Sequence, residues 1–464
     1  MNPEDVAACI ETANRYARSG DLTRAIEYYG KALRIDPNSF AAWNNLGNVF
    51  LQLNNPGGAR TCYENAVQLR PWDGAAWYNL GRTLDLLGRH REALQHLLAA
   101  CEFNPRHADA WTNLGNVHQN LGNFDEALRC FDRALPLAEH PAEVHVNRAM
   151  VLLNRGDFRE GWREYEYRWD TNGFAAYKKL SFGAPRWKGE SLAGKSILLY
   201  AEQGFGDAIQ FARFIPAVTE RAAEVFLEVG APLRQLLEKL APRGHILERG
   251  EALPRVDYHC SLMSLPLALN LEISSIPGEP YLAVPESARG AAREAIERET
   301  AGRPALKAGL CWRGKTTHRW NHVRSMTVDK LAPLGSVADV QWFLLQKDAT
   351  EQEIAQLREG LHLSVLPQKH LEGFLATAAV IDALDLVLSI DTVTAHLTGA
   401  LGKPLWLFLP AFYDWRWHAH LSSSPWYPTA RLWRQKEPGS WEGAVESAAK
   451  QLEKAVSQKA ARPS

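Results

Sequence analysis

The chain has 464 residues, of which 46% are hydrophobic and 23% charged, and its formal net charge is −1 at pH 7. This length allows about three domains, and the near-zero charge provides no global attraction to nucleic acid or to an anionic membrane. No window approaches ~18 uninterrupted apolar residues, the first residues lack signal-peptide character, and the six cysteines are scattered. We therefore expect a cytoplasmic protein with free thiols, without a membrane span or a metal site.

The first third of the chain carries a repeat with a period of 34 residues. Trp43, Trp77 and Trp111 are each 34 residues apart, and the same step links columns of leucine, glycine, alanine and proline: Leu46, Leu80, Leu114; Gly47, Gly81, Gly115; Ala25, Ala59, Ala93, Ala127; Pro37, Pro71, Pro105. This pattern resembles the tetratricopeptide repeat, in which each unit is a pair of antiparallel helices. It predicts an α-solenoid over residues 1–170, with small residues where the paired helices approach closely and a proline after each second helix.

The pattern weakens at the end of the solenoid. Between residues 145 and 169, Arg148 replaces the leucine and Gly161 replaces the alanine. We interpret this segment as a last helix pair that joins the solenoid to the next domain. Residues 171–194 are loop-like and form the expected linker, with Trp187 expected to dock on the domain that follows.

A further column at the same period consists of asparagines, namely Asn45, Asn79, Asn113 and Asn147. If these side chains line a concave groove, their amides can pair with the backbone of an extended protein or peptide acceptor. The alternative is that asparagine simply suits this position of the repeat. Arrays of this kind are partner surfaces under either interpretation.

Strands and helices alternate from residue 195 onward, which predicts parallel sheets with helices on both faces. The run from Lys195 to Pro216 begins with an apolar strand at 197–200, continues through a turn in which Gly204 and Gly206 are free to take positive φ, and enters a helix at 208–214. A second round begins at Lys307. We expect two Rossmann-like lobes, 195–300 and 301–452, with a ligand cleft between them at the carboxyl ends of the strands, and a tail over 453–464. The other expected strands are 224–229, 245–247, 257–260, 340–346, 363–366, 386–390 and 404–409.

Asp207 is the first candidate for chemistry, because it stands where the glycine turn meets the helix. A carboxylate there can accept a proton from a hydroxyl as a general base, or it can simply cap the backbone N–H groups of the helix.

The second candidate is the helix start at Asp391, Thr392 and Val393, with His396 one turn further on. The exposed N–H groups of a helix start form a phosphate site, so these residues can hold a nucleotide. The alternative is a capped helix with a packed histidine.

The third candidate is the basic loop from Cys311 to Met326, with the cations Arg313, Lys315, Arg319 and Arg324 and the titratable His318 and His322. This loop either clamps a diphosphate or is a solvated surface loop. The histidines show no spacing typical of a metal site. Four aromatic residues beyond it, Trp415, Trp417, Trp426 and Tyr427, either stack on a sugar or base or pack between the lobes.

These motifs together resemble the bacterial heptosyltransferase-like glycosyltransferases of GT-B architecture, in the version fused to tetratricopeptide repeats. Gly206-Asp207 is similar to that family's G-D motif, whose aspartate is the proposed base. Asp391-Thr392-x3-His396 is similar to its donor motif, and Arg324 stands where the family places a basic residue on the donor diphosphate. Residues 410–414 correspond to a family loop ending T-D-P, from which the tryptophan-rich continuation here departs. The layout is also similar to that of O-GlcNAc transferase.

The resemblance implies an inverting, metal-independent transfer of a sugar from a nucleotide-sugar to an acceptor recruited by the repeats. The nucleotide-sugar is a co-substrate, and no resident cofactor is expected. The alternative is a scaffold without catalytic activity that binds protein partners through its solenoid.

Overall fold

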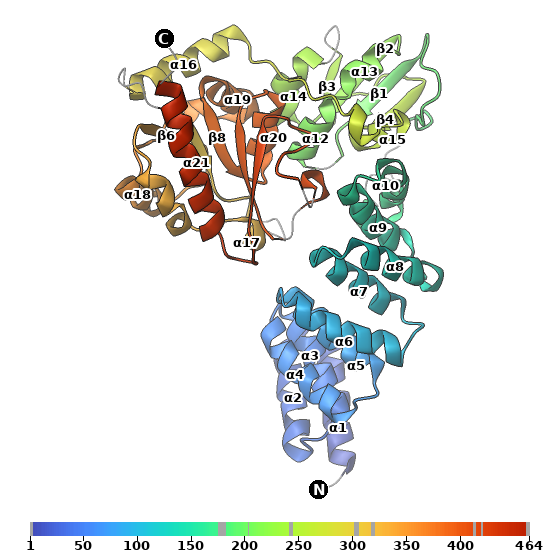
Figure 1. The fold of residues 1–464 in the computed structure, drawn as a ribbon. Coiled ribbons are helices and arrows are strands. Elements are labelled where there is room, and N and C mark those ends of the chain that lie inside the picture. Colours follow the sequence, from blue (N-terminus) through green and yellow to red (C-terminus); the bar gives the residue numbers. More distant parts are fainter. Residues whose placement is uncertain are drawn as a thin grey trace. The chain divides into compact units, whose positions relative to one another are not determined.

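The computed structural model describes residues 3–174, 182–202, 204–240, 245–300, 306–316, 321–411, 414–418 and 421–460. The chain forms two compact units, Met1–Val151 and Leu152–Ser464 (Figure 1). Each unit is described by itself below.

The first unit is a helical solenoid in which each helix packs on the next one along the chain. Its helices are α1 (Pro3–Arg18), α2 (Leu22–Ile35), α3 (Phe40–Gln52), α4 (Pro56–Leu69), α5 (Gly74–Leu86), α6 (His90–Phe103), α7 (Ala108–Asn120) and α8 (Phe124–Ala134). The following helix, α9 (Ala142–Arg155), crosses the division between the units. A helical solenoid in the N-terminal region is confirmed, and the division between the two units falls after Val151 rather than at the predicted residue 170.

The repeated glycines mark the closest approach of the paired helices. A Cβ atom at Gly47 would lie 2.6 Å from the Tyr63 ring, and one at Gly81 would lie 2.7 Å from the Leu97 side chain. Such distances are far below van der Waals contact, so alanine there would overpack the pair at a cost of about 1–3 kcal/mol.

The repeated tryptophan and proline are joined by a hydrogen bond. In each of three repeats the tryptophan Nε1–H donates to the carbonyl of the proline six residues earlier, at 2.7–2.9 Å: Trp43 to Pro37, Trp77 to Pro71 and Trp111 to Pro105. The proline ends the preceding helix, and its carbonyl then fixes the tryptophan of the next repeat. This contact explains why the two columns recur together.

After the end of α9, the second unit continues with α10 (Phe158–Tyr165) and the 3₁₀ helix η2 (Glu166–Asp170) and then forms a front lobe around a four-stranded parallel sheet. Its strands, in the order β3-β2-β1-β4, are β1 (Ser196–Tyr200), β2 (Glu224–Val229), β3 (Ile246–Glu248) and β4 (Tyr258–Ser261). Its helices are α12 (Phe205–Ala212), α13 (Ile215–Thr219), α14 (Ala231–Leu237) and α15 (Leu265–Ala268), and α16 (Glu286–Thr300) leads out of it. As expected, Trp187 is buried on this lobe, and its backbone N–H donates to the carbonyl of His259.

The rear lobe is built on a six-stranded parallel sheet in the order β10-β9-β8-β5-β6-β7. The strands are β5 (Leu306–Cys311), β6 (Val340–Leu344), β7 (Leu363–Ser364), β8 (Leu386–Ile390), β9 (Leu405–Leu409) and β10 (Ala430–Arg434). The helices are α17 (Asn321–Arg324), α18 (Glu351–Gly360), α19 (Gly373–Ala383), α20 (Val393–Ala400) and α21 (Glu442–Ala460), the last of which runs through most of the expected tail. The predicted parallel sheets with helices are confirmed.

Helix α10 packs against both lobes of the second unit through aromatic contacts. Trp162 meets Phe211 of the front lobe and Trp415 of the rear lobe edge-on, with ring centroids 5.7 and 5.2 Å away. Phe158 stacks on His418 at 5.9 Å. The segment after the solenoid is therefore part of the core where the two lobes join.

Among the described residues, none of the helices combines the length and apolar character needed to cross a bilayer.

Candidate functional site

The candidate site lies where two helices, one from each lobe, meet at the carboxyl ends of their sheets. Helix α12 follows β1, α20 follows β8, and the two helices are in contact and lie side by side (Figure 1). A Cβ atom at Gly206 would lie 2.8 Å from the His396 ring. Neither glycine uses the positive φ that is open to it, because Gly204 has φ −64° and Gly206 lies inside α12. The glycine at 206 instead allows the helices to approach.

Asp207 sits in the first turn of α12, and both of its carboxylate oxygens are engaged. Oδ2 accepts the backbone N–H of Gly204 at 3.1 Å, so the capping contact exists for this oxygen. Oδ1 accepts the Arg416 guanidinium at 2.6 Å. Burial raises the pKa of Asp207 and the negative Asp414 adds to this, while the charge of Arg416 opposes it.

Asp391 and His396 lie close together at the start of α20, with Asp391 Oδ1 3.9 Å from His396 Nε2. Burial, together with repulsion from Asp414, raises the pKa of Asp391 to about 6, although Arg324 and Arg416 oppose the shift. Burial and the nearby guanidinium groups hold the pKa of His396 well below its usual value, so its ring is neutral. The other ring nitrogen, Nδ1, lies 3.0 Å from the Tyr427 hydroxyl.

Thr392 is the N-cap of α20, and Val393 is its first helical residue. The Thr392 side chain makes no capping hydrogen bond to the helix, and its hydroxyl lies 3.2 Å from that of Ser389. Arg324 reaches the same point, because its Nη1 donates to the backbone carbonyl of Asp391 at 3.0 Å. One cation of the basic loop therefore stands beside the helix start.

The other cations of the basic loop are placed differently. Arg313 forms an ion pair with Glu353 at 2.9 Å and donates to the carbonyl of Asp348 at 2.7 Å, so its contacts point toward α18. Lys315 is exposed. His318 and Arg319 lie outside the described residues, as does the side chain of His322.

The four aromatic residues after β9 are packing residues. Trp415, Trp417, Trp426 and Tyr427 are each at most 3% exposed. Trp417 stacks on His396 at 5.6 Å, and Trp415 meets Trp162 of α10. Of the two alternatives, packing between the lobes is the one observed.

Sequence reasoning missed the residue that links the lobes at Asp207. Arg416, in the 3₁₀ helix η10 (Trp415–Trp417), donates from Nη2 to Asp207, from Nε to Gln210 Oε1 at 2.7 Å and from Nη1 to Asp414 Oδ1 at 2.7 Å. Its only sequence signal is the arginine between two tryptophans, and its front-lobe partners lie over 200 residues away in the chain.

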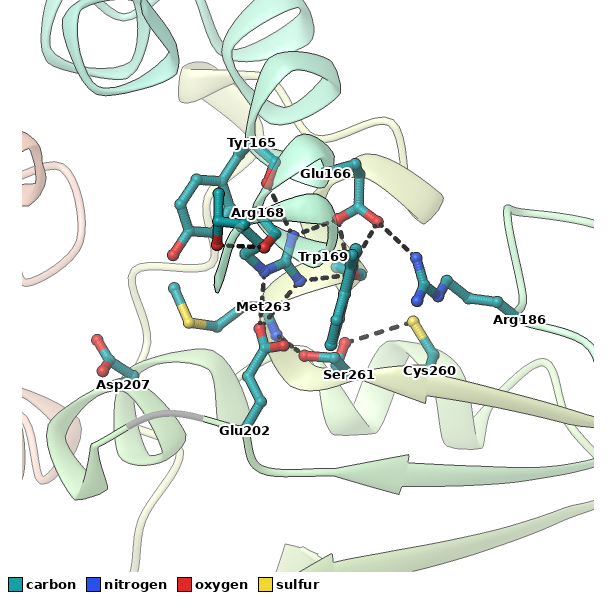
Figure 2. A network of polar contacts seen from close by, with 12 residues as sticks. Tyr165, Glu166, Arg168, Trp169, Arg186, Glu202, Asp207, Cys260, Ser261 and Met263 are labelled. Carbon is teal, nitrogen blue, oxygen red and sulfur yellow. Dashed lines mark hydrogen bonds and ion pairs between the residues drawn. The ribbon is translucent and has the colours of Figure 1, made fainter. Parts of the chain in front are cut away.

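A second missed cluster anchors the segment after the solenoid to the front lobe (Figure 2). Arg168 of η2 is 1% exposed and donates from Nε and Nη2 to Glu202 Oε1 at 3.1 and 2.9 Å. It also donates to Glu166 Oε1 at 2.7 Å and to Ser264 Oγ at 2.7 Å. This network therefore holds Glu202, which follows β1, to the segment after the solenoid.

The asparagine column of the solenoid serves partly as contacts between repeats. Asn45 donates to Asn14 Oδ1 and Asn79 to Asn44 Oδ1, each at 3.1 Å. Asn113 donates to the carbonyl of Asp109 in its own helix at 2.8 Å, and Asn147 is half-buried on α9. An amide group has two donor hydrogens and two acceptor lone pairs, so one such bond does not exhaust it.

Comparison with known proteins identifies the repeats. Models described as TPR repeat or tetratricopeptide repeat match residues 13–54, 46–108 and 108–141. Residues 13–141 are tetratricopeptide repeats. Repeats of this type support a role as a protein-interaction scaffold.

One curated relative extends further along the chain. Protein FlbA of Caulobacter vibrioides is 25% identical over an alignment of 303 residues that covers 61% of this chain and 50% of FlbA. The chain thus spans about half the length of this relative.

Several solved structures are similar to part of this chain. They include the MamA protein (21% identity, 39% of this chain and 98% of MamA, TM-score 0.35). YrrB, titled a TPR protein with an unusual peptide-binding site, is 27% identical over 39% of this chain and 94% of its own, with a TM-score of 0.34. Pseudomonas aeruginosa PilF is 25% identical over 39% of this chain and 79% of its own, with a TM-score of 0.33.

Proposed function

We propose that this protein is an inverting, metal-independent glycosyltransferase that moves a sugar from a nucleotide-sugar to an acceptor recruited by its repeats. One observation carries the proposal: the first turns of α12 and α20 meet, so Asp207 of one lobe and the helix start at Thr392 of the other belong to one neighbourhood. Ligands of parallel α/β sheets bind at the carboxyl ends of strands, where both of these helices begin.

The donor's diphosphate would lie at the start of α20. Backbone N–H groups at a helix start attract phosphate, and the Thr392 hydroxyl can add a hydrogen bond. Arg324 contributes a positive charge beside this point, since it already contacts the carbonyl of Asp391. Arg313 is paired with Glu353, so we assign Arg324 the larger share of diphosphate binding.

The acceptor's hydroxyl would lose its proton to Asp207. A general base works best when its pKa approaches the working pH, and burial raises the pKa of this carboxyl. The deprotonated oxygen would then attack the anomeric carbon while the nucleoside diphosphate leaves, which inverts the configuration.

The repeats would bring the acceptor. Tetratricopeptide arrays bind proteins and peptides, and the asparagine column at Asn45, Asn79, Asn113 and Asn147 would hold part of an extended acceptor backbone. A protein acceptor is therefore the first class to test.

A thermal-shift panel of nucleoside diphosphates and nucleotide-sugars tests the proposal on the full chain. A ligand at a hundredfold excess over its Kd should stabilise the fold by about 2.7 kcal/mol. Arg324→Gln should weaken the shift, whereas Arg431→Gln, the same change at an exposed position of β10, should leave it unchanged. Mass spectrometry of acceptor proteins incubated with the responding donor should then detect the added sugar.

A scaffold without transfer activity is the second candidate, favoured by the ion pair in which Arg416 occupies Asp207 Oδ1. It predicts no response to any nucleotide in the same panel, together with retained binding of protein partners by the repeats.

A further inference from the structure

Arg416 reaches from the rear lobe into the front lobe at the point where Asp207 lies. It belongs to the loop after β9, and it is 7% exposed. Two of its three side-chain partners, Asp207 and Gln210, are on α12 of the front lobe, and the third, Asp414, is on its own loop. The guanidinium therefore bridges the two lobes.

The Arg416 guanidinium is itself held firmly. Asp414 also accepts the Arg416 backbone N–H at 3.0 Å, and the Trp415 ring lies 4.5 Å from the guanidinium carbon. The Trp415 ring in turn packs edge-on against Trp162 of α10. A planar guanidinium fixed on several sides dictates the direction of the carboxylate that it binds.

The groups that face Asp207 come from several elements. Arg416 and Asp414 come from the rear loop, and Tyr165 of α10 lies within electrostatic range of Asp207. The neutral His396 of α20 lies beyond Gly206. Among these groups Arg416 supplies the positive charge, and it binds the oxygen that Gly204 does not hold.

We propose that Arg416 is a positioning residue for Asp207: it orients the carboxylate and favours its ionised form. An arginine of the rear lobe thus positions the base of the front lobe. The inference rests on the proposed function, in which Asp207 is the base. It also implies that the base is fully formed only while the two lobes are in contact.

The test follows the titration of Asp207 in the full chain labelled with ¹³C-aspartate, with the Asp207 signal assigned by its loss in Asp207→Asn. Without the guanidinium, Arg416→Gln should raise the pKa of Asp207 by about one unit or more, and Arg416→Lys should raise it less. Arg431→Gln makes the same change at an exposed residue and should leave the titration unchanged. If Arg416→Gln does not fold, the titration of Asp207 in Arg416→Lys tests the proposal in its place.

Transfer kinetics supply the second measurement. In Arg416→Gln, the midpoint of the acid limb of the kcat/KM profile should move to higher pH by the same amount as the pKa of Asp207. In the double variant, adding Arg416→Gln to Asp207→Asn should cause little further loss of transfer activity. An unchanged Asp207 titration in a folded Arg416 variant would overturn the proposal. A wild-type chain that transfers no sugar while the titration shifts would refute the proposed function alone and support the contact between Arg416 and Asp207.

Discussion

Three carboxylates, Asp207, Asp391 and Asp414, share the neighbourhood of the Arg416 guanidinium. Burial and repulsion from Asp414 raise the pKa of both Asp207 and Asp391, and Arg416 reduces the rise in each case. Carboxyl groups in such settings accept protons nearer neutral pH than exposed ones do, which suits acid–base chemistry. The same setting makes the stability of the fold depend on pH.

Asp391→Asn should stabilise the protein at pH 8. The folded pKa of Asp391 is about 6 against an ordinary value of 3.8, so the folded state holds the proton more tightly than the unfolded state. The resulting reduction in the free energy of unfolding is complete above pH 6 and fades as the pH falls toward 4. Asparagine removes it, so the variant should gain up to about 3 kcal/mol at pH 8, and the gain should vanish near pH 4. Denaturant unfolding of the full chain at both pH values measures the difference.

Glu442→Gln is the control, because its expected change in stability at pH 8 has the opposite sign. Its hydrogen bond with Lys330 lowers the pKa of Glu442 to about 2, so its stabilising contribution is present above the ordinary carboxyl pKa and is lost as the pH falls through 2. This variant should be slightly less stable at pH 8, since exposed pairs contribute little. A loss of stability at pH 8 in Asp391→Asn would contradict the account of its burial.

Individual site residues differ in how far the sequence reveals them. Asp207, Thr392 and His396 stand at junctions between an apolar strand and a helix, a local pattern that can be read directly. Arg416 cannot be found in this way, because its partners Gln210 and Asp207 are 206 and 209 residues away. Only the folded chain brings them together.

Among the elements, most strands were predictable, the edge strands β3, β4 and β7 among them, but the edge strand β10 was not. Residues 386–390 and 224–229 read as strands and are strands, and the fully buried 386–390 is the nearly continuous apolar run that the interior of a parallel sheet requires. Strand β10 lies at the edge of the sheet and is only partly buried, and its sequence A-R-L-W-R has no such run. The bounds of β10 therefore depend on its pairing with β9, which the sequence does not display.

The 3₁₀ helix η2 should depend on Arg168 for its attachment to the front lobe. Arg168→Met leaves Glu202 and Glu166 without their buried cation, so it should lower the free energy of unfolding by about 3–5 kcal/mol. Adding Glu202→Gln should recover part of this loss, because one uncompensated buried charge is removed. Denaturant unfolding of the full chain measures all three proteins.

Arg163→Met is the matched control for that prediction. Arg163 lies on α10 and pairs with Glu160 on the surface, with both side chains more than 40% exposed, so its loss should change stability little. If Arg168→Met were as stable as Arg163→Met, the buried network would not be what holds η2 to the lobe.

At the scale of the whole molecule, the chain combines a tetratricopeptide solenoid with a unit of two parallel sheets. The 34-residue period identified the solenoid, and the alternation of strands and helices identified the sheets. No period links Trp162 to Trp415 or Arg168 to Glu202, so the packing of the segment after the solenoid into the second unit had to be observed.

The central claim is that Asp207 and the start of α20 form one catalytic site, and Asp207→Asn tests it most directly. Asparagine keeps the size of the side chain and removes its basicity, while Arg324 and Thr392 stay in place to bind the donor. With saturating nucleotide-sugar, the variant should bind donor with an unchanged Kd, and its transfer rate should fall at least about a hundredfold below wild type. Transfer by Asp207→Asn at the wild-type rate would contradict the account.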